Sequence, residues 1–507
     1  MSALAQPLAA SAVQSVDWLA IAPPTAAAVV GLAVLVADLF VPDAKKAVLG
    51  WVSVAGLAVS ALLLLPLLDG DRSTFCLTGD PTACSYTADR FTLVIQFLVL
   101  GGALLAALLS VTALKDAGRN VPEGEFWFLL LSSAAGAALL PASRDLATLI
   151  VALEVASLPA FALVGIRHGD RKSSEAALKF FLSSVTATAV SLMGISFVYA
   201  STGTLYLTQI ADRIQHVDGQ LHTLAQTGVV LTLVGFAFKT AAVPFHFWVP
   251  DTYVGAPLPV AAYLSVVGKA VGFSGLILVT VVALPSYGEV WGPAVALLAA
   301  LTMTVGNVGA LRQQATRAYS AVRLLAWSSV GQAGYLLVPI AAAAYVKDGQ
   351  KAIGSTVAYA LMYGAVNLGA FAVAALVGRT KPLNRISDYR GLYASNPLAA
   401  LTLAFFLLCL AGLPPGIIGL FAKVTVFSAA VDAGLGWLAV VMAVNVVIAL
   451  FYYLQWTALL FRAPEGEPAK HRVPAPLTAA ITVTAVLGIA LSGAPQLVLR
   501  FAATGLF

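Results

Sequence analysis

Charged residues are scarce in this sequence. Only 10% of its 507 residues are Asp, Glu, Lys or Arg, whereas 60% are hydrophobic, and the mean hydropathy is +0.92. Because a soluble domain carries about 25% charged residues, this composition excludes a large water-soluble core and predicts a polytopic membrane protein. The net charge of +5 does not indicate a nucleic-acid partner, since the basic residues lie in loops between long apolar runs.

Cysteine is scarce as well, with three residues in the chain. The sequence has no cysteine cluster and no glycine-rich phosphate loop, so we expect this chain to bind no iron–sulfur cluster, metal, flavin or nucleotide. Cys76 and Cys84 share one loop, where a disulfide is expected if the loop faces an oxidising compartment, with two free thiols as the alternative. Cys409 lies in an apolar run and is expected to be a packing residue.

Long apolar runs are abundant, and a helical membrane span needs about 20 such residues. We therefore predict an all-α fold in a single integral membrane domain of residues 1–507, with about fourteen spans of which the seventh and twelfth are broken. The predicted spans are 18–41, 46–68, 91–114, 126–142, 146–166, 176–200, 227–249, 257–283, 291–311, 322–344, 352–377, 396–430, 434–461 and 475–499.

The basic residues are distributed unevenly between the two sets of loops. With the N-terminus outside, seventeen of the 28 lysines and arginines fall in inner loops, seven lie at the outer side and four lie within spans. Lysine and arginine are enriched in loops on the cytoplasmic side of a membrane. We therefore predict that both termini face the outer side.

Two lysines, Lys239 and Lys269, lie inside the apolar runs of the seventh and eighth spans. A charge at mid-membrane costs about 2.5–3.5 kcal/mol, so it is retained where it faces protein or water and has a function. Pro244 has no N–H, which should leave the carbonyl of Thr240 without a helical partner beside the ammonium of Lys239. With the imidazole of His246 nearby, this break predicts a hydrated ion path.

A third lysine, Lys423, lies in the twelfth span after the break at Pro414. Two broken helices, five spans apart, therefore carry one lysine each, which predicts two related five-helix units. Because five is odd, the second unit should have inverted topology, as in many transporters. The expected division is three N-terminal helices, the two five-helix units and a last helix: 1–115, 126–283, 291–461 and 475–507.

Other polar residues within spans complete the candidate set. Glu154 lies near the middle of the fifth span, where the buried lysines are its obvious partners and a neutral structural acid is the alternative. Lys179 follows Glu175 by four residues, a favourable ion-pair spacing on a helix, but it can also extend to the membrane interface, so its role stays open. In the eleventh span, Tyr363 and Asn367 are expected to hydrogen-bond between helices or to hold water.

Four segments follow one another along the chain: ALEVASLPAFALVG, KTAAVPFHFWVPDTYVGAPLPVAAYLSVVGKA, LAWSSVGQAGYLL and AGLPPGIIGLFAKVTVF. With these segments in the same order, the chain resembles the antiporter-like subunits of respiratory complex I over residues 90–460. Two features resemble the N type of this family rather than the L type, the M type or the Mrp antiporter subunits. They are the motif PDTYVGAP with Ser265, and Lys423 in place of a glutamate. Gln332 stands where relatives often have histidine, which leaves the link between the two units open.

The resemblance implies proton pumping in a NADH–quinone oxidoreductase of the bacterial cell membrane, coupled to quinone reduction in other subunits. NADH, FMN, iron–sulfur clusters and quinone are then expected in partner subunits. Other antiporter-like and small membrane subunits, and the lipid bilayer, are the expected partners. The family's pump residues correspond to Glu154, Lys239, Lys269 and Lys423, with Lys179 as an accessory residue, and His246 is a further accessory candidate.

A charge switch is the mechanism that these residues indicate. Burial favours the neutral amine of Lys239 and a nearby Glu154 carboxylate favours the ammonium, so displacing the carboxylate would release the proton. Lys269 would relay protons from the inner side and between the units, and Lys423 would be the last buried site before the outer face. Two alternatives remain: a stand-alone or Mrp-type cation/proton antiporter, and a structural subunit whose lysines only join helices.

Overall fold

Long apolar helices make up most of the fold. The computed structural model describes residues 16–347, 349–464, 473–503 and 505–507. In this part of the chain, thirteen helical segments are long and apolar enough to cross a membrane. They are α1 (Trp18–Asp38), α2 (Ala47–Leu62), α3 (Arg90–Ala117), α4 (Glu123–Leu139), α5 (Leu146–Val164), α6 (Arg171–Thr202), α8 (His222–Thr240), the segment containing α10 and α11 (Leu258–Ala283), α12 (Gly288–Leu311), α13 (Ser320–Ala342), α14 (Gly349–Gly378), α18 (Gly436–Leu460) and α19 (Ala475–Gly493).

Two spans are interrupted near their middle, as the sequence predicts. Helix α8 ends before Pro244, and the chain resumes as α9 (Trp248–Gly255). The second interruption contains Pro414 and separates α16 (Pro397–Ala411) from α17 (Ile417–Asp432). Proline lacks the N–H that a continuing helix needs, which explains both stops. Because α16 and α17 together make one crossing, they account for the fourteenth span.

Aspartates fix where several of the spans begin. Asp89, Asp145 and Asp170 precede α3, α5 and α6, and the side chain of each accepts a hydrogen bond from a backbone N–H of the first helical turn. Such N-caps satisfy amides that have no partner within the helix, and each contributes about 1 kcal/mol. These polar caps therefore hold the ends of otherwise apolar helices at the two faces of the bundle.

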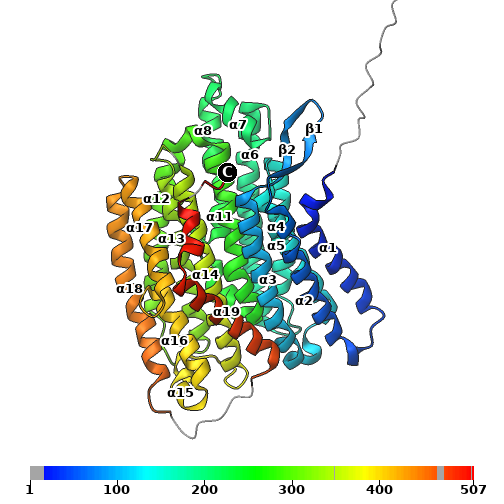
Figure 1. Cartoon of the computed structure of the whole chain (residues 1–507), viewed down its shortest axis with the longest axis vertical. Coiled ribbons are helices and arrows are strands. Elements are labelled where there is room, and N and C mark those ends of the chain that lie inside the picture. Colours follow the sequence, from blue (N-terminus) through cyan, green and yellow to red (C-terminus); the bar gives the residue numbers. More distant parts are fainter. Residues whose placement is uncertain (1–15, 348, 465–472, 504) are drawn as a thin grey trace, which may run out of the picture.

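The helices run side by side between two faces of different composition (Figure 1). One face carries the hairpin of β1 (Arg72–Leu77) and β2 (Asp80–Ala88) together with α7 (Leu207–Arg213), and we name it the hairpin side. The opposite face, where α15 (Leu392–Ser395) lies, is named the basic side, because its connections and adjoining helix ends carry fifteen of the seventeen basic residues counted above. The other two, Lys470 and Arg472, lie outside the described residues.

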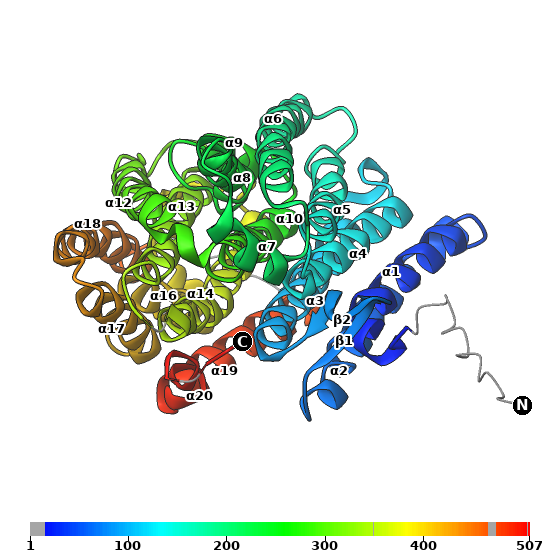
Figure 2. The ribbon, with the colours of Figure 1, turned by 90° about the horizontal axis from the view of Figure 1, so that it is seen from above.

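Seen from above, the bundle is elongated in the membrane plane (Figure 2). Helices α1 and α2 stand at one edge, α17 and α18 stand at the other, and the remaining spans fill the space between them. Helix α19 packs against α3 and α14. In the middle, α13 and α14 are almost fully enclosed by other helices, whereas α1 and α19 are largely uncovered. Residues carried by the central helices are thus shielded from lipid on all sides.

The expected disulfide is present in the hairpin. Strands β1 and β2 pair antiparallel, and Cys76 lies directly opposite Cys84 in their register. A disulfide joins the two residues. Cys409, in α16, is a buried free thiol, in agreement with its expected packing role.

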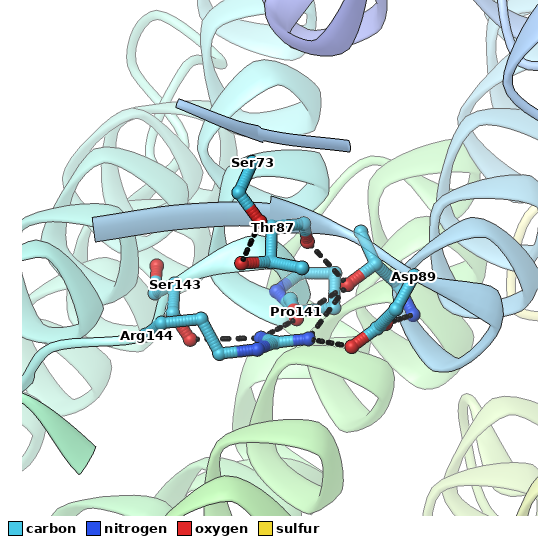
Figure 3. A network of polar contacts seen from close by, with 7 residues as sticks. Ser73, Thr87, Asp89, Pro141, Ser143 and Arg144 are labelled. Carbon is cyan, nitrogen blue, oxygen red and sulfur yellow. Dashed lines mark hydrogen bonds and ion pairs between the residues drawn. The ribbon is translucent and has the colours of Figure 1, made fainter. Parts of the chain in front are cut away.

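A buried ion pair ties the hairpin side together (Figure 3). Arg144, in the connection between α4 and α5, pairs with Asp89, and the two side chains are each 11% exposed. The same guanidinium donates to the carbonyls of Pro141 and Ser143 at 2.8 and 2.9 Å. Asp89 also caps α3 through the N–H of Thr92 at 2.9 Å. The start of α3 and the α4–α5 connection are therefore held to one another by charge.

Removing the guanidinium should destabilise the protein strongly. We expect Arg144→Ala to lower the free energy of unfolding by about 3–5 kcal/mol, because Asp89 is left buried without a counter-charge. The loss can be measured by denaturant unfolding of the purified protein. The Asp89→Asn variant retains a capping side chain. The free energy of unfolding lost by the double variant Arg144→Ala, Asp89→Asn should therefore be smaller, by at least about 1 kcal/mol, than the sum of the losses in the two single variants. Additive losses would contradict a direct interaction.

Candidate functional site

The three candidate lysines are buried in the bundle. The exposed fractions of Lys239, Lys269 and Lys423 are 3%, 2% and 5%. Among the described residues, none of the three forms an ion pair with a carboxylate. Instead, each ammonium donates hydrogen bonds to neutral oxygens. This pattern differs from helix-joining salt bridges, in which each buried charge would have an opposite charge beside it.

Lys239, on the last turn of α8, points towards α5 and α6. Its Nζ donates to the hydroxyl of Ser157 at 2.6 Å. The ammonium also lies 5.7 Å and 5.4 Å from the ring centres of Phe161 and Phe180, within the range of cation–π attraction. Glu154 lies one turn before Ser157 on the same helix, so its carboxylate is near the amine without being bonded to it.

Glu154 itself is half-buried and bonded to another helix. Its Oε1 accepts a hydrogen bond of 2.8 Å from Thr188 of α6. Around it, Val151, Val155 and Leu158 of α5 are exposed, so this stretch of the helix forms part of the outer surface of the bundle. The carboxylate therefore lies between the surface and the buried amine of Lys239.

The open carbonyl at the first break is bonded to a different lysine from the one that the sequence indicates. The carbonyl of Thr240 accepts from Nζ of Lys269 at 3.4 Å, not from Lys239. Side chains on a helix lean towards its N-terminus, so Lys239 points away from the carbonyls at the end of α8. Lys269 approaches from the start of α11 (Lys269–Ile277), directly after a π-helical turn.

The second break binds its lysine more closely. Nζ of Lys423, in α17, donates to the carbonyls of Leu410 and Ala411 at 2.8 Å each. These are the last residues of α16. In a continuous helix their carbonyls would accept hydrogen bonds from backbone N–H groups of the next turn. Gly412 ends α16 with φ of 84°, a left-handed conformation that favours glycine. Both breaks thus present backbone oxygens to an ammonium.

Lys179 lies near the basic side in an ion network. It pairs with Glu175 at 2.6 Å, as the spacing predicts, and its side chain is 47% exposed. It also pairs at 2.9 Å with Asp251 of α9, which lies 3.5 Å from Arg323 of α13. Asp251 is not among the residues expected from the sequence, although a carboxylate inside PDTYVGAP was a visible signal. Asp251 therefore connects α9 with α6 and with α13.

His246 is not brought to Lys239. The imidazole is half-buried, and its ring centre lies 5.5 Å from that of Trp327 in α13. Pro244 and Phe247 on either side are exposed, so the turn between α8 and α9 reaches the outer surface of the bundle. The expected cluster of lysine, open carbonyl and imidazole therefore does not form. Lys269 takes the carbonyl, and His246 contacts the second unit.

Hydroxyl and amide groups surround the region next to Lys269. Tyr363 donates its one proton to the carbonyl of Ser265 at 2.9 Å and therefore accepts a hydrogen bond from Ser329, also at 2.9 Å. Asn367 donates to the hydroxyl of Ser265 at 2.7 Å. The expectation that Tyr363 and Asn367 bond between helices is confirmed. Ser265 lies four residues before Lys269, about one turn earlier along the same helical segment.

A second cluster surrounds Gln332 and continues towards Lys423. The side-chain N–H of Gln332 donates to Tyr453 at 3.2 Å, and its carbonyl oxygen accepts from Tyr359. The ring of Tyr335 lies 6.0 Å from that of Tyr359 and 5.4 Å from Nζ of Lys423. Neither Tyr359 nor Tyr453 was identified from the sequence. An amide and three phenols therefore occupy the region between the two units.

Metal ligands do not gather anywhere in the described part of the chain. No group of three or more His, Cys, Asp or Glu side chains is positioned to hold a metal ion there.

Comparisons with known proteins agree with this fold. Residues 143–449 match the family described as NADH:quinone oxidoreductase/Mrp antiporter, TM. The chain is 74% identical over 514 residues to NADH-quinone oxidoreductase subunit N 2 of Streptomyces griseus, an alignment that covers 98% of this chain and 96% of that one.

Two solved structures contain similar chains. One, in respiratory complex I from Thermus thermophilus with bound aureothin, has a TM-score of 0.76 at 32% identity, and the match covers 95% of this chain and 100% of that one. Another, in the Mrp complex from Dietzia sp. DQ12-45-1b, has a TM-score of 0.82 at 21% identity and covers 96% of each chain. The second likeness shows the fold alone.

The fold and the matching family model define the class of antiporter-like multi-pass membrane proteins. Within that class, the chain belongs to the NADH-quinone oxidoreductase subunit N family. The family resemblance drawn from the sequence is thus confirmed.

Adding a methyl group at Gly412 should disturb Lys423. The Cβ of Gly412→Ala would lie 3.2 Å from Cδ and 3.5 Å from Nζ of Lys423, in a left-handed conformation that costs about 1–2 kcal/mol for alanine. Gly434 also has a left-handed φ, of 72°, with no atom near the added Cβ, so Gly434→Ala is a matched control.

Both variants should lose similar stability in denaturant unfolding. Only Gly412→Ala should also reduce NADH-driven proton uptake by vesicles, by about threefold or more at equal amounts of assembled complex. Equal uptake by the two variants would show that Gly412 serves only to end α16.

Proposed function

We propose that this chain is a proton-translocating membrane subunit of a NADH–quinone oxidoreductase, and that its buried lysines carry the protons. The observation that supports this most directly is that three lysines are enclosed in the bundle and bonded only to neutral oxygens. A buried amine with a carboxylate partner would stay charged, whereas one held by hydroxyls and carbonyls can lose its proton and leave no unpaired negative charge behind. The same observation argues against lysines that only join helices.

Lys239 and Glu154 form the switch in this proposal. The carboxylate acts on the ammonium across a short gap in which Ser157 holds the amine and Thr188 holds the acid. In a low-dielectric interior, displacing one charge by a few ångströms changes the interaction by more than the 1.4 kcal/mol that shifts a protonation equilibrium tenfold. Moving Glu154 therefore makes Lys239 bind or release a proton.

Lys269 and Lys423 continue the path. Lys269 lies beside the first break and next to the hydroxyl cluster at Ser265, so we assign it the transfer from the inner side and between the units. Lys423 lies beside the second break and is assigned as the last buried site before the outer face. Lys179 and His246 are assigned accessory roles near the basic side and at the contact with α13.

The redox chemistry belongs to partner subunits in this proposal. NADH, FMN, iron–sulfur clusters and quinone are expected there, and their reactions supply the energy for pumping. Neighbouring antiporter-like and small membrane subunits, with lipid, would cover the apolar side chains that remain exposed on α1, α5 and α18. The relative from Streptomyces griseus, which is named as a subunit of such an oxidoreductase, supports this assignment.

The proposed orientation puts the basic side in the cytoplasm and both ends of the chain on the outer side of a bacterial cell membrane. The concentration of lysine and arginine on one face supports it. The disulfide on the opposite face supports it as well, because disulfides persist in oxidising compartments. In this frame α4 begins at the inner face and α12 at the outer face, as two inverted five-helix units, 126–283 and 291–461, require.

Substitutions of Lys239 test the switch. Lys239→Ala should lower NADH-driven proton uptake by inverted membrane vesicles about tenfold or more. Lys239→Arg should be nearly as harmful, because a guanidinium keeps its charge and cannot release the proton at accessible pH. Glu154→Gln should also impair uptake, since the amine loses its counter-charge.

Control measurements separate this role from a structural one. The amount of assembled complex is measured for each variant, and its ability to reduce quinone is followed in detergent. If Lys239 only joined helices, arginine would restore function. Wild-type proton uptake by assembled Lys239→Ala complex would refute the proposal.

The orientation can be tested through the hairpin cysteines. After treatment with a membrane-impermeant reductant, Cys76 and Cys84 should react with an impermeant maleimide in right-side-out membranes and not in inverted vesicles. Cys409 is buried and serves as an internal control, and a Cys76→Ser, Cys84→Ser variant should not be labelled. Labelling without reductant would contradict the disulfide in the cell, and labelling only in inverted vesicles would reverse the orientation.

A further inference from the structure

A cavity of about 650 Å³ lies at the base of the hairpin. Its walls are the end of the apolar segment that contains α2, the start of α3 and the residues after α20 (Gln496–Leu499). The α2 segment leads into β1 and α3 follows β2, so the cavity lies where apolar helices give way to polar connections. That level of a membrane protein corresponds to the boundary between hydrocarbon and phospholipid headgroups. The volume is typical of a site for a small ligand.

Charged side chains of both signs line this cavity. Arg90 begins α3 and Arg500 follows α20, whereas Asp69 and Asp71 lie in the connection between α2 and β1. All four residues are exposed. Among the described residues, Arg90, Asp69 and Asp71 form no ion pair, with each other or with any other side chain. Two positive and two negative charges therefore face one space, and three of them can pair with a ligand.

An uncovered apolar stripe on α3 continues from the cavity into the membrane. Val94 lines the cavity, and Phe97, Gly101 and Leu104 follow it at intervals of three or four residues. This spacing places the four residues on one face of the helix. All four are at least partly exposed, Phe97 to 62%, and a Cβ at Gly101 would meet no atom within 4 Å.

The stripe has the length of one acyl chain. Helices α2 and α19 both pack against α3 and lie on either side of it (Figure 2). Val94 and Leu104 are ten residues apart, which corresponds to about 15 Å along a helix that rises 1.5 Å per residue. Half of a hydrocarbon core that is about 30 Å thick is the same distance. The stripe thus runs from the level of the headgroups to the middle of the membrane.

We propose that the cavity and the stripe bind phosphatidylethanolamine from the leaflet on the hairpin side. Arg90 and Arg500 bind the phosphate, because a guanidinium pairs with phosphate oxygens through two parallel hydrogen bonds. Asp69 and Asp71 accept hydrogen bonds from the primary ammonium group. One acyl chain lies on the stripe of α3. The bound lipid joins the ends of α2, α3 and α20, a role that goes beyond the proposed function and involves no proton transfer.

The balance of charges distinguishes this lipid from others. Phosphatidylglycerol offers a phosphate to the arginines but places no positive charge beside Asp69 and Asp71. The quaternary ammonium of phosphatidylcholine has no N–H to donate to these carboxylates. Free phosphate has neither a positive charge nor an apolar part for the stripe. A zwitterionic headgroup with a primary amine is complementary to all four side chains.

Photolabelling of the assembled complex tests the site. The complex is placed in phosphatidylcholine nanodiscs that contain a trace of phosphatidylethanolamine with a diazirine in one acyl chain. After irradiation, mass spectrometry of peptides should find the label on α3 between Val94 and Leu104. Unlabelled phosphatidylethanolamine should reduce this labelling at a concentration about fivefold or more below that required of phosphatidylglycerol, and inorganic phosphate should not reduce it.

Variants of the charged residues test the headgroup contacts. Arg90→Gln should lower labelling of α3 about fivefold or more at equal amounts of assembled complex. Arg213→Gln is the matched control, because Arg213 is exposed in α7 on the same side and does not line the cavity. The double variant Asp69→Asn, Asp71→Asn should lose the preference for phosphatidylethanolamine over phosphatidylglycerol, since the ammonium no longer meets a negative charge.

Filling the stripe tests the position of the acyl chain. Gly101→Leu adds an apolar side chain where no atom lies near, so assembly should be unchanged while labelling of α3 falls about fivefold or more. Gly436→Leu is the matched control, because Gly436 is an equally open glycine at the start of α18. Its labelling should match that of the wild type.

The inference stands if α3 is labelled with this preference and only the variants at the site lower the labelling. It is overturned if α3 is not labelled, or if Arg90→Gln is labelled as the wild type is. Equal competition by phosphatidylglycerol or inorganic phosphate also overturns it, since the site would then recognise a phosphate alone. Labelling requires no turnover, so none of these results depends on the outcome of the Lys239 variants.

Discussion

An ammonium group inside an apolar bundle must be given oxygen ligands, and the architecture of this protein depends on how that need is met. Interrupting a helix removes backbone hydrogen bonds and leaves carbonyls open. At each break one lysine uses them: Lys269 at the end of α8 and Lys423 at the end of α16. Three features produce this arrangement: prolines stop the helices, residues in the left-handed conformation end them, and the enclosed helices α13 and α14 lie beside the breaks.

Charges of two kinds are separated in space. At the two faces, ion pairs such as Arg144 with Asp89 and Arg379 with Asp116 hold permanent charges that fix the ends of helices. Between the faces, the lysines are held by hydroxyls, carbonyls and aromatic rings, which stabilise a positive charge without carrying a negative one. The helix ends at the two faces and the buried lysines between them are therefore held by different kinds of interaction.

Much of the fold was predictable, because spans, breaks and the disulfide depend on local sequence: apolar runs, prolines and two nearby cysteines. The site was predictable only as a set of residues. Helices that are apolar all round give no periodic signal of their rotation, so nothing showed that Lys239 points to Ser157 while Lys269 takes the carbonyl of Thr240. Partners such as Tyr359, Tyr453 and Asp251 were missed because their contacts join segments far apart in the chain.

The amide of Gln332 has a consequence for communication between the two units. Its side chain is neutral at every pH, with one phenol on its N–H and another on its carbonyl oxygen. An amide cannot store a proton, but turning it by half a rotation exchanges donor and acceptor and obliges both phenols to reverse their O–H bonds. This amide in the middle of the bundle thus orders the direction of the hydrogen bonds on either side of it and holds no charge of its own.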